Sequence, residues 1–191
     1  LALGIATDAP MALQRMIPDY TASLEASTEG ACEDGACEPE HEVQASTDFA
    51  QCARSGAKDC GTLPAIGATE WLNSLGEPHG TVTLVDFWSS SCVNCAREIP
   101  EVERIYEKYK DAGLVVIGVH SPQQAHEREA SVVSGAASRL GITYPVALDP
   151  ELEAFKAYGA NAWPTHYLAG PDGQLRSMGR GTSGLEEQIR T

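Results

Sequence analysis

Apolar residues in this chain gather in short runs that predict buried strands, and the two longest runs flank a stretch with helical spacing. Residues 81–87 and 114–119 contain few polar positions, which is typical of strands buried on both faces. Between them the apolar positions fall on one stripe of a helix that we expect from about Cys92 to Lys110, with a kink at Pro100. A strand, a helix and a second strand in this order favour a parallel crossover unit.

The rest of the pattern predicts further strands and helices. After the second strand we expect a helix at 121–140, a strand at 144–148, a helix at 151–158, a strand at 163–168, a turn at 171–173, a returning strand at 174–178 and a helix from 185. Before the first strand, Trp71 and Leu72 are expected in a short helical turn in the core, and a loop follows at 76–80. Pro64 keeps the segment 63–66 out of the centre of a sheet, so it is an entry strand or an irregular edge.

Residues 1–61 differ in composition from the rest of the chain. No Lys or Arg occurs between Arg15 and Arg54, and Glu, Ser, Thr and Ala are frequent there, as in a linker. We therefore expect an acidic extension over residues 1–61 and a folded domain over residues 62–191. The apolar start at Leu1 and the shortened last helix predict a fragment that follows a membrane segment or a signal peptide.

The formal net charge of −14 limits the classes of partner. Nucleic acids and anionic membrane surfaces attract basic proteins, so neither is an expected partner. An acidic balance mainly keeps a protein soluble. No apolar run reaches the roughly 18 residues that a membrane span requires.

Six cysteines form three pairs that are close in the sequence. We expect structural disulfides within the pairs Cys32–Cys37 and Cys52–Cys60, although four cysteines allow three connectivities. Such bonds indicate an oxidising compartment. A metal site that uses Cys32, Cys37 and His41 is the alternative, but it lacks a fourth ligand.

The third pair, Cys92 and Cys95, follows the first predicted strand and three serines, and it opens the predicted helix. Free N–H groups and the positive end of the helix dipole stabilise an anion at a helix start, so the pKa of a cysteine there should be lowered. The spacing allows the two sulfurs to form and break a disulfide. A C-x-x-C pair also occurs in zinc sites, but a strand before it and a helix after it favour a dithiol redox site.

The residues around this pair resemble the thioredoxin fold. Thioredoxins have a buried aspartate six residues before the first cysteine, an aromatic pair after that aspartate, a proline inside the helix and a cis-proline on a later strand, which correspond here to Asp86, Phe87-Trp88, Pro100 and Pro164. The long segment 121–150 is similar to the extracytoplasmic TlpA/ResA-like branch, which serves cytochrome c maturation and disulfide reduction. Residues 71–74, 92–95, 117–120 and 144–145 resemble the thioredoxin domain of DipZ-type proteins, which is fused to a CcdA-like membrane unit.

The resemblance implies an α/β fold: a thioredoxin-like mixed sheet flanked by helices, with a central insertion and an acidic, Cys-containing N-terminal extension. In such a fold Cys92 attacks a substrate disulfide and Cys95 resolves the mixed disulfide. Asp86 would lie beneath Cys95 with a raised pKa and exchange protons with it, and Pro164 would be cis and face the cysteines. The substrate groove would comprise Trp88, Val93, Asn94, Trp163 and Thr165, although both tryptophans also suit a core.

We therefore expect a membrane-tethered, extracytoplasmic thiol–disulfide oxidoreductase that reduces disulfides of envelope proteins. A CcdA-like electron donor in the same polypeptide would supply it, with no bound cofactor or metal, and the isolated domain would be a monomer. The dipeptide Val93-Asn94 lacks the histidine of strongly oxidising relatives, so a reducing potential is expected.

Three other functions remain open from the sequence. Cys92, Cys95 and His166 would suit Cu(I), which prefers thiolate and imidazole, although His166 also fits an exposed strand position. A peroxiredoxin-type peroxidase is disfavoured, because Val85 and Ser89 stand where that signature has Pro and Thr. The cysteine pair could also form a disulfide that never cycles. Two further features are expected to be structural: His120 at a strand end, and a solvated helix face made of Glu98, Glu101, Glu103 and Glu107.

Overall fold

Strand pairing builds one six-stranded sheet in the order β1-β4-β3-β2-β5-β6. The computed structural model describes residues 40–57, 59–74 and 81–190, and all the elements below lie in the unit Pro39–Thr191. The strands are β1 (Trp71–Leu72), β2 (Val82–Trp88), β3 (Leu114–His120), β4 (Val146–Leu148), β5 (Thr165–Ala169) and β6 (Leu175–Gly179). β2, β3 and β4 are parallel, whereas β1 pairs antiparallel with β4, β5 with β2, and β6 with β5.

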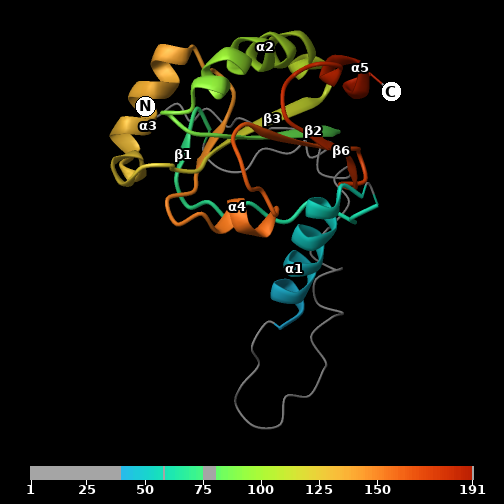
Figure 1. Ribbon diagram of the computed structural model, residues 1–191. Helices are drawn as coiled ribbons and strands as arrows, with labels where there is room; N and C mark the ends of the chain where they lie inside the picture. The colour runs from blue at the N-terminus through green and yellow to red at the C-terminus, as the bar shows by residue number, and fades with distance from the viewer. Residues whose placement is uncertain (1–39, 58, 75–80, 191) are drawn as a thin grey trace, which may run out of the picture. The chain divides into compact units, whose positions relative to one another are not determined.

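Helices cover both faces of this sheet (Figure 1). One face carries the elements α2 (Val93–Tyr109), α3 (Ala130–Leu140) and α5 (Leu185–Ile189), and the other carries α1 (Glu40–Ser55) and α4 (Glu153–Ala157). Two short 3-10 helices, η3 (Lys110–Ala112) and η4 (Ala125–Arg128), complete the fold. This is the thioredoxin-like mixed sheet that the sequence predicted.

The alternation of side chains along β2 divides the core into two layers. Leu84 and Trp88 pack with the buried stripe of α2, and Val85 and Phe87 pack on the opposite face with α1 and α4. Because successive side chains of a strand point to opposite faces, Asp86 shares the α2 face with Leu84 and Trp88. A carboxyl group is thus placed inside an apolar layer.

Several predicted elements are confirmed within one to two residues. They include the two long strands, the helix that contains Pro100, the short helix α4 and the hairpin between β5 and β6, whose turn is closed by a 2.9 Å hydrogen bond from the Gly173 N–H to the Gly170 carbonyl. The predicted edge segment 63–66 contains no strand, and a single bridge between Thr62 and Gln174 precedes it. Of the two alternatives, an entry strand or an irregular edge, the segment is therefore the irregular edge.

Two predicted helices are wrong. Trp71 and Leu72 form β1, and the Asn73 side chain after them donates to the carbonyls of Ile142 and Tyr144 at 3.1 Å, which fixes the edge of the sheet. The helix expected over 121–140 is interrupted, since η4 is separated from α3 by Glu129 in an extended conformation (φ −75°, ψ 120°).

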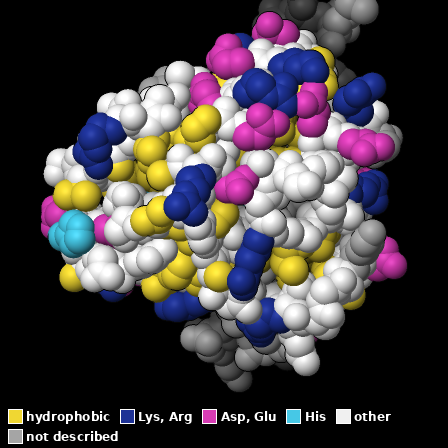
Figure 2. All heavy atoms as spheres, turned by 45° about the horizontal axis from the view of Figure 1, so that its top comes forward, with side chains coloured by type: hydrophobic (Ala, Val, Ile, Leu, Met, Phe, Trp, Pro, Cys, Tyr) yellow, Lys and Arg dark blue, Asp and Glu magenta, His cyan; other side chains and the backbone are white. Residues whose placement is uncertain are grey.

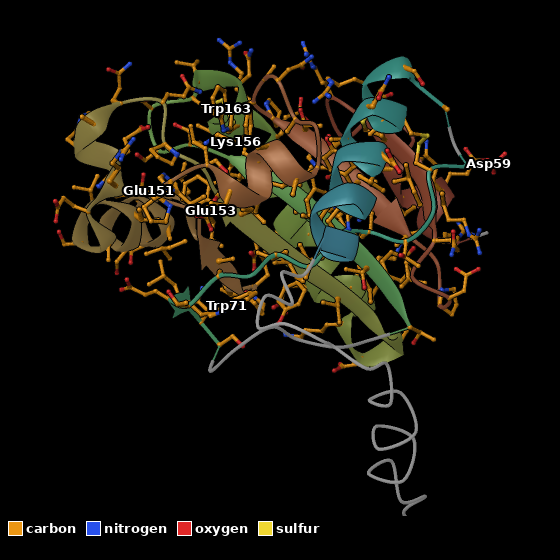
Figure 3. The ribbon with its side chains drawn as sticks, turned by 90° about the horizontal axis from the view of Figure 1, so that it is seen from below. Asp59, Trp71, Glu151, Glu153, Lys156 and Trp163 are labelled. Carbon is orange, nitrogen blue, oxygen red and sulfur yellow. A yellow bond between two sulfur atoms is a disulfide. The ribbon has the colours of Figure 1, made fainter. Side chains whose placement is uncertain are left out.

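Helix α1 lies within the segment that the sequence assigned to a linker-like extension. Its side chains Phe49 and Ala53 are 3% and 0% exposed, and Phe49 packs edge-on against Tyr158. A disulfide between Cys52 and Cys60 joins the helix to the following segment. Figure 3 shows α1 beside α4, so this part of the extension is packed onto the sheet.

Some expectations lie outside the described residues. These are the Cys32–Cys37 pair with His41, the apolar start of the chain and the loop at 76–80. In the part of the chain that the structure describes, no helix is both long enough and apolar enough to cross a bilayer.

Candidate active site

Cys92 stands at the start of α2 as its N-cap, and a disulfide joins it to Cys95. The backbone N–H of Cys95 donates to Cys92 Sγ at 3.1 Å. The first N–H groups of a helix have no partner within the helix, so this sulfur takes the place of a capping oxygen. The same N–H would stabilise a thiolate at Cys92, as the sequence predicted from the position of the residue.

The two sulfurs differ in access to solvent. Cys92 is 9% exposed and Cys95 is 1% exposed, in a core cluster with Leu84 and Trp88. Val93, between them, is 65% exposed, which is unusual for a large apolar side chain in this structure. The outer sulfur is therefore the one that a second protein can reach, and Val93 offers an apolar contact beside it.

A buried glutamate, which no sequence pattern indicated, holds the three serines that precede Cys92. Glu127, in η4, is 0% exposed. Its carboxylate accepts hydrogen bonds from the hydroxyls of Ser89 (2.9 Å) and Ser90 (2.8 Å) and from the N–H of Ser91 (2.7 Å). The only available signal was an acid, one of two with Glu129, in a segment predicted to be helical.

Glu127 also accepts the backbone N–H groups of Gln123 and Gln124, at 2.6 and 3.0 Å. Burial raises the pKa of Glu127, but the hydrogen bonds from the serines and from its own loop outweigh burial and hold the pKa at about 2. A charged carboxylate thus ties the insertion to the loop that carries Cys92. These bonds also explain why the predicted helix at 121–140 is interrupted, because its first residues curl around this carboxylate.

His120 supports the same loop from the end of β3. It is 1% exposed, and its Nε2 accepts the N–H of Ser90 at 3.1 Å. Burial lowers its pKa to about 4, although the carboxylate of Glu127 opposes the shift. His120 is therefore neutral at pH 7, with Nε2 free to accept, and its role is to position the loop.

Asp86 and His166 face each other across β2 and β5. They are cross-strand partners, 1% and 3% exposed, and His166 Nδ1 lies 3.2 Å from Asp86 Oδ1. The distance is that of an ion pair, without the alignment of a hydrogen bond. The sequence expected an exposed strand histidine at 166, and that interpretation is wrong, since the residue faces the core.

The peptide bond between Trp163 and Pro164 is cis, as predicted. Of the residues predicted to line a groove, Val93 and Asn94 are exposed, Thr165 is buried with its hydroxyl bonded to the Ala162 carbonyl, and Trp88 has no exposed surface. The core alternative therefore fits Trp88. Trp163 is half-buried, stacks on Phe155 of α4 at 4.5 Å, and lies beside α4 in Figure 3.

The acidic residues of α2 form specific contacts. Figure 2 shows acidic and basic side chains next to one another on the side that carries α2 and α5. The pairs include Glu101–Arg104, Glu107–Lys110, and Glu186 of α5 with Lys108. Glu98 accepts from the N–H and hydroxyl of Thr182, and Glu103 from Thr143. The negative charge therefore serves mainly to attach α5 and the segment after α3.

The described residues contain no group of three or more His, Cys, Asp or Glu side chains that could hold a metal ion. In particular, His166 lies against Asp86, and Cys92, Cys95 and His166 do not form such a group, so the structure does not support the alternative of a copper site. The dithiol–disulfide chemistry of Cys92 and Cys95 is what this arrangement can perform.

Comparison with known proteins agrees with this chemistry. Residues 63–178 match the AhpC/TSA family. The chain is 39% identical to the protein DipZ of Mycobacterium tuberculosis over 208 residues, which cover 99% of this chain and 29% of that relative. It is also 31% identical to the thiol-disulfide oxidoreductase YkuV of Bacillus subtilis over 127 residues, covering 63% of this chain and 83% of YkuV.

Solved structures give the same fold. A thioredoxin-like protein determined in solution in its oxidised form superposes with a TM-score of 0.62 at 28% identity, over 68% of this chain and 93% of that one. The chain spans less than a third of the length of DipZ, so most of that relative lies outside the match.

Proposed function

The chain belongs to the AhpC/TSA family, and on that basis, together with the geometry of its cysteine pair, we propose that it reduces disulfide bonds of other proteins outside the cytoplasm. The observation that carries the proposal is the position of Cys92. Cys92 is the more exposed residue of the two, and its sulfur accepts an N–H at the start of a helix that would stabilise its thiolate.

The reaction follows from the placement of the two sulfurs. In the reduced protein the Cys92 thiolate attacks a substrate disulfide, forms a mixed disulfide and releases one substrate sulfur as a thiolate. Cys95 then loses its proton and attacks Cys92 Sγ, which releases the second substrate sulfur. The protein is oxidised by two electrons, and the substrate leaves as two thiols after it takes up two protons.

An extracytoplasmic location is supported by the disulfide between Cys52 and Cys60, which lies apart from the active pair. Structural disulfides persist in oxidising compartments and are rare in the cytosol. We further propose that a CcdA-like membrane unit in the same polypeptide returns electrons to Cys92 and Cys95. The similarity to DipZ supports that arrangement, since DipZ is more than three times as long as the part of it that this chain matches.

Trapping of the covalent intermediate tests this function. Cys95→Ser should keep the nucleophile and lose the resolving thiol, so it should accumulate mixed disulfides with its protein substrates. The adducts are visible on non-reducing gels, disappear with dithiothreitol and can be identified by mass spectrometry. The rate at which the wild-type protein reduces insulin, with dithiothreitol as the electron donor, measures the catalytic activity itself.

Cys92→Ser is the matched control, because it removes the nucleophile and leaves Cys95 buried. It should form no adducts and reduce no insulin. Adducts on Cys92→Ser but not on Cys95→Ser would reverse the assigned roles. Turnover of hydrogen peroxide without any insulin reduction would replace the proposed function with a peroxidase.

A further inference from the structure

The Asp86–His166 pair lies in the layer that also contains the resolving sulfur. Asp86 lies between Leu84 and Trp88 on the face of β2 that α2 covers, and Cys95 of α2 packs in the same buried cluster as these two residues. In the cross-strand register Asp86 stands between His166 of β5 and Gly118 of β3. The carboxyl group is therefore the ionisable side chain of β2 that lies beneath the cysteine helix.

Gly118 leaves space for polar side chains around this carboxyl. A Cβ at Gly118 would lie 2.8 Å from the ring of Tyr144 and 3.2 Å from Trp88 Nε1. Among the described residues, the Tyr144 hydroxyl, Trp88 Nε1 and both ring nitrogens of His166 are buried without a hydrogen-bond partner. Unsatisfied polar groups are costly in a core, so several together require an explanation, such as a catalytic role or bound water.

His166 belongs to this buried cluster and also lines a cavity. The cavity has a volume of about 100 Å³ and lies between β5, β6 and the segment that leads into α5. Ser177, Arg180 and Gln188 line it together with His166, and several of its lining residues are exposed. A polar cavity of this size has room for several water molecules, each of which needs roughly 10–15 Å³.

We propose that His166 acts through Asp86 as a proton relay, which exchanges the proton of Cys95 with water in this cavity. The proposal rests on the proposed disulfide reduction. When Cys95 attacks the mixed disulfide, its proton moves to the carboxylate of Asp86. In the same step an imidazolium at His166 releases the proton of its Nε2 to water in the cavity, so one proton enters the pair and one leaves. Reduction of the dithiol reverses both transfers.

The charges around His166 are consistent with a protonated imidazole at rest. Burial lowers its pKa, but the carboxylate of Asp86 and the more distant Glu98 of α2 outweigh burial and raise it. The other ionisable groups nearby are Tyr144, whose pKa is raised by burial, and Arg180 at the cavity. An imidazolium paired with a carboxylate carries no net charge, and such a pair beneath Cys95 disfavours a thiolate there less than an unpaired carboxylate does.

A single-turnover experiment tests the relay. The reduced protein is mixed with oxidised glutathione, and the attack by Cys92 and the closure of the Cys92–Cys95 disulfide are resolved by acid quenching and mass spectrometry between pH 5 and pH 9. In His166→Gln we expect closure to slow by about tenfold or more at pH 7, because general acid–base assistance typically contributes 10²–10⁴-fold. The initial attack should change by less than about threefold, and the pH inflection of closure should disappear.

Asp86→Asn should slow closure to the same degree, and the double variant should be no slower than either single one. Met178→Leu is the matched control, since Met178 lines the same cavity without a titratable group, and its closure rate should equal that of the wild type. Closure by His166→Gln at the wild-type rate and with the wild-type pH profile would overturn the relay.

If His166→Gln does not fold, an NMR titration of the wild-type protein still tests the relay. The imidazole resonances of His166 should titrate with a pKa above that of a free histidine, and this pKa should differ between the reduced and oxidised proteins. An identical titration in both redox states would overturn the relay. A wild-type protein that forms no mixed disulfide with glutathione would instead contradict the proposed function itself.

Discussion

Glu127 is the residue through which the insertion between β3 and α3 reaches the cysteine loop. A buried carboxylate usually destabilises a fold, but this one accepts hydrogen bonds from Ser89, Ser90 and Ser91 and from two N–H groups of its own segment. Hydrogen bonds to a charged acceptor contribute about 1.5–3 kcal/mol each. The position of Cys92 therefore depends on a residue 35 positions later in the chain.

Glu127→Gln should loosen this loop. The substitution keeps the size of the side chain but places an amide NH₂ group against donors, so we expect the free energy of unfolding to fall by about 2–4 kcal/mol. Hydrogen exchange at the Ser91 amide should accelerate, which can be followed by NMR. Glu151→Gln is the matched control, because Glu151 is exposed in an ion pair with Arg128 and its loss should change stability by less than about 1 kcal/mol. An unchanged Ser91 exchange rate in Glu127→Gln would contradict the positioning role.

At the level of elements, the sequence predicted what periodicity and local chemistry determine. The apolar runs located β2 and β3, and the C-x-x-C motif located the start of α2. β1 was missed because a strand of two residues is too short to show an alternation of apolar and polar positions. Its pairing with β4 is decided by contacts more than 70 positions away. α1 was missed because its sequence has only two large apolar residues, Val43 and Phe49, in an acidic segment.

The candidate site divides in the same way. The C-x-x-C motif indicated Cys92 and Cys95, and the resemblance to thioredoxins indicated Asp86 and Pro164, whereas Glu127 and the burial of His166 depend on tertiary contacts. No local pattern indicates which acid in a polar segment will fold onto which loop. The Asp86–His166 contact likewise requires the register between β2 and β5, which a sequence does not reveal.

Gly159, two residues after the end of α4, lies against α1. This residue has φ of +68°, and a Cβ there would lie 2.4 Å from the backbone oxygen of Ala50. Gly159→Ala should therefore destabilise the protein by about 3 kcal/mol, from the left-handed backbone and the clash together. The control is Gly141→Ala, at φ of +71° with no atom within 4 Å, which should cost only about 1 kcal/mol. Urea unfolding gives both values, and equal losses would mean that α1 does not pack on α4 in solution.

For the whole molecule, buried ionisable groups make stability depend on pH. The pKa of His120 is lowered from 6.5 to about 4, so the unfolded chain binds a proton before the folded protein does. Its contribution to stability is full above pH 6.5 and is lost as the pH falls through 4. His166, whose pKa is raised, has the opposite effect: its contribution is full below pH 6.5 and is lost as the pH rises through its folded value.

We therefore expect the free energy of unfolding of the oxidised protein to fall by about 2 kcal/mol between pH 6.5 and pH 4.5. His166 opposes this fall by at most about 0.4 kcal/mol in this window, because the unfolded chain is only half protonated at this histidine at pH 6.5. His120→Gln, which keeps an acceptor for the Ser90 N–H, should flatten the slope. His126→Gln, at an exposed position, should leave it unchanged. A slope that is equal in all three proteins would show that His120 is not buried in its neutral form.

The central claim is that the start of α2 activates the Cys92 sulfur, and the alkylation rate of this thiol tests it most directly. The rate with iodoacetamide would be measured against pH in the reduced Cys95→Ala protein, with the modified residue identified by peptide mass spectrometry. A thiolate that titrates well below the value of about 8.5 for a free cysteine is the expected result. Titration at or above pH 8.5, or a sulfur that the reagent cannot reach, would contradict it.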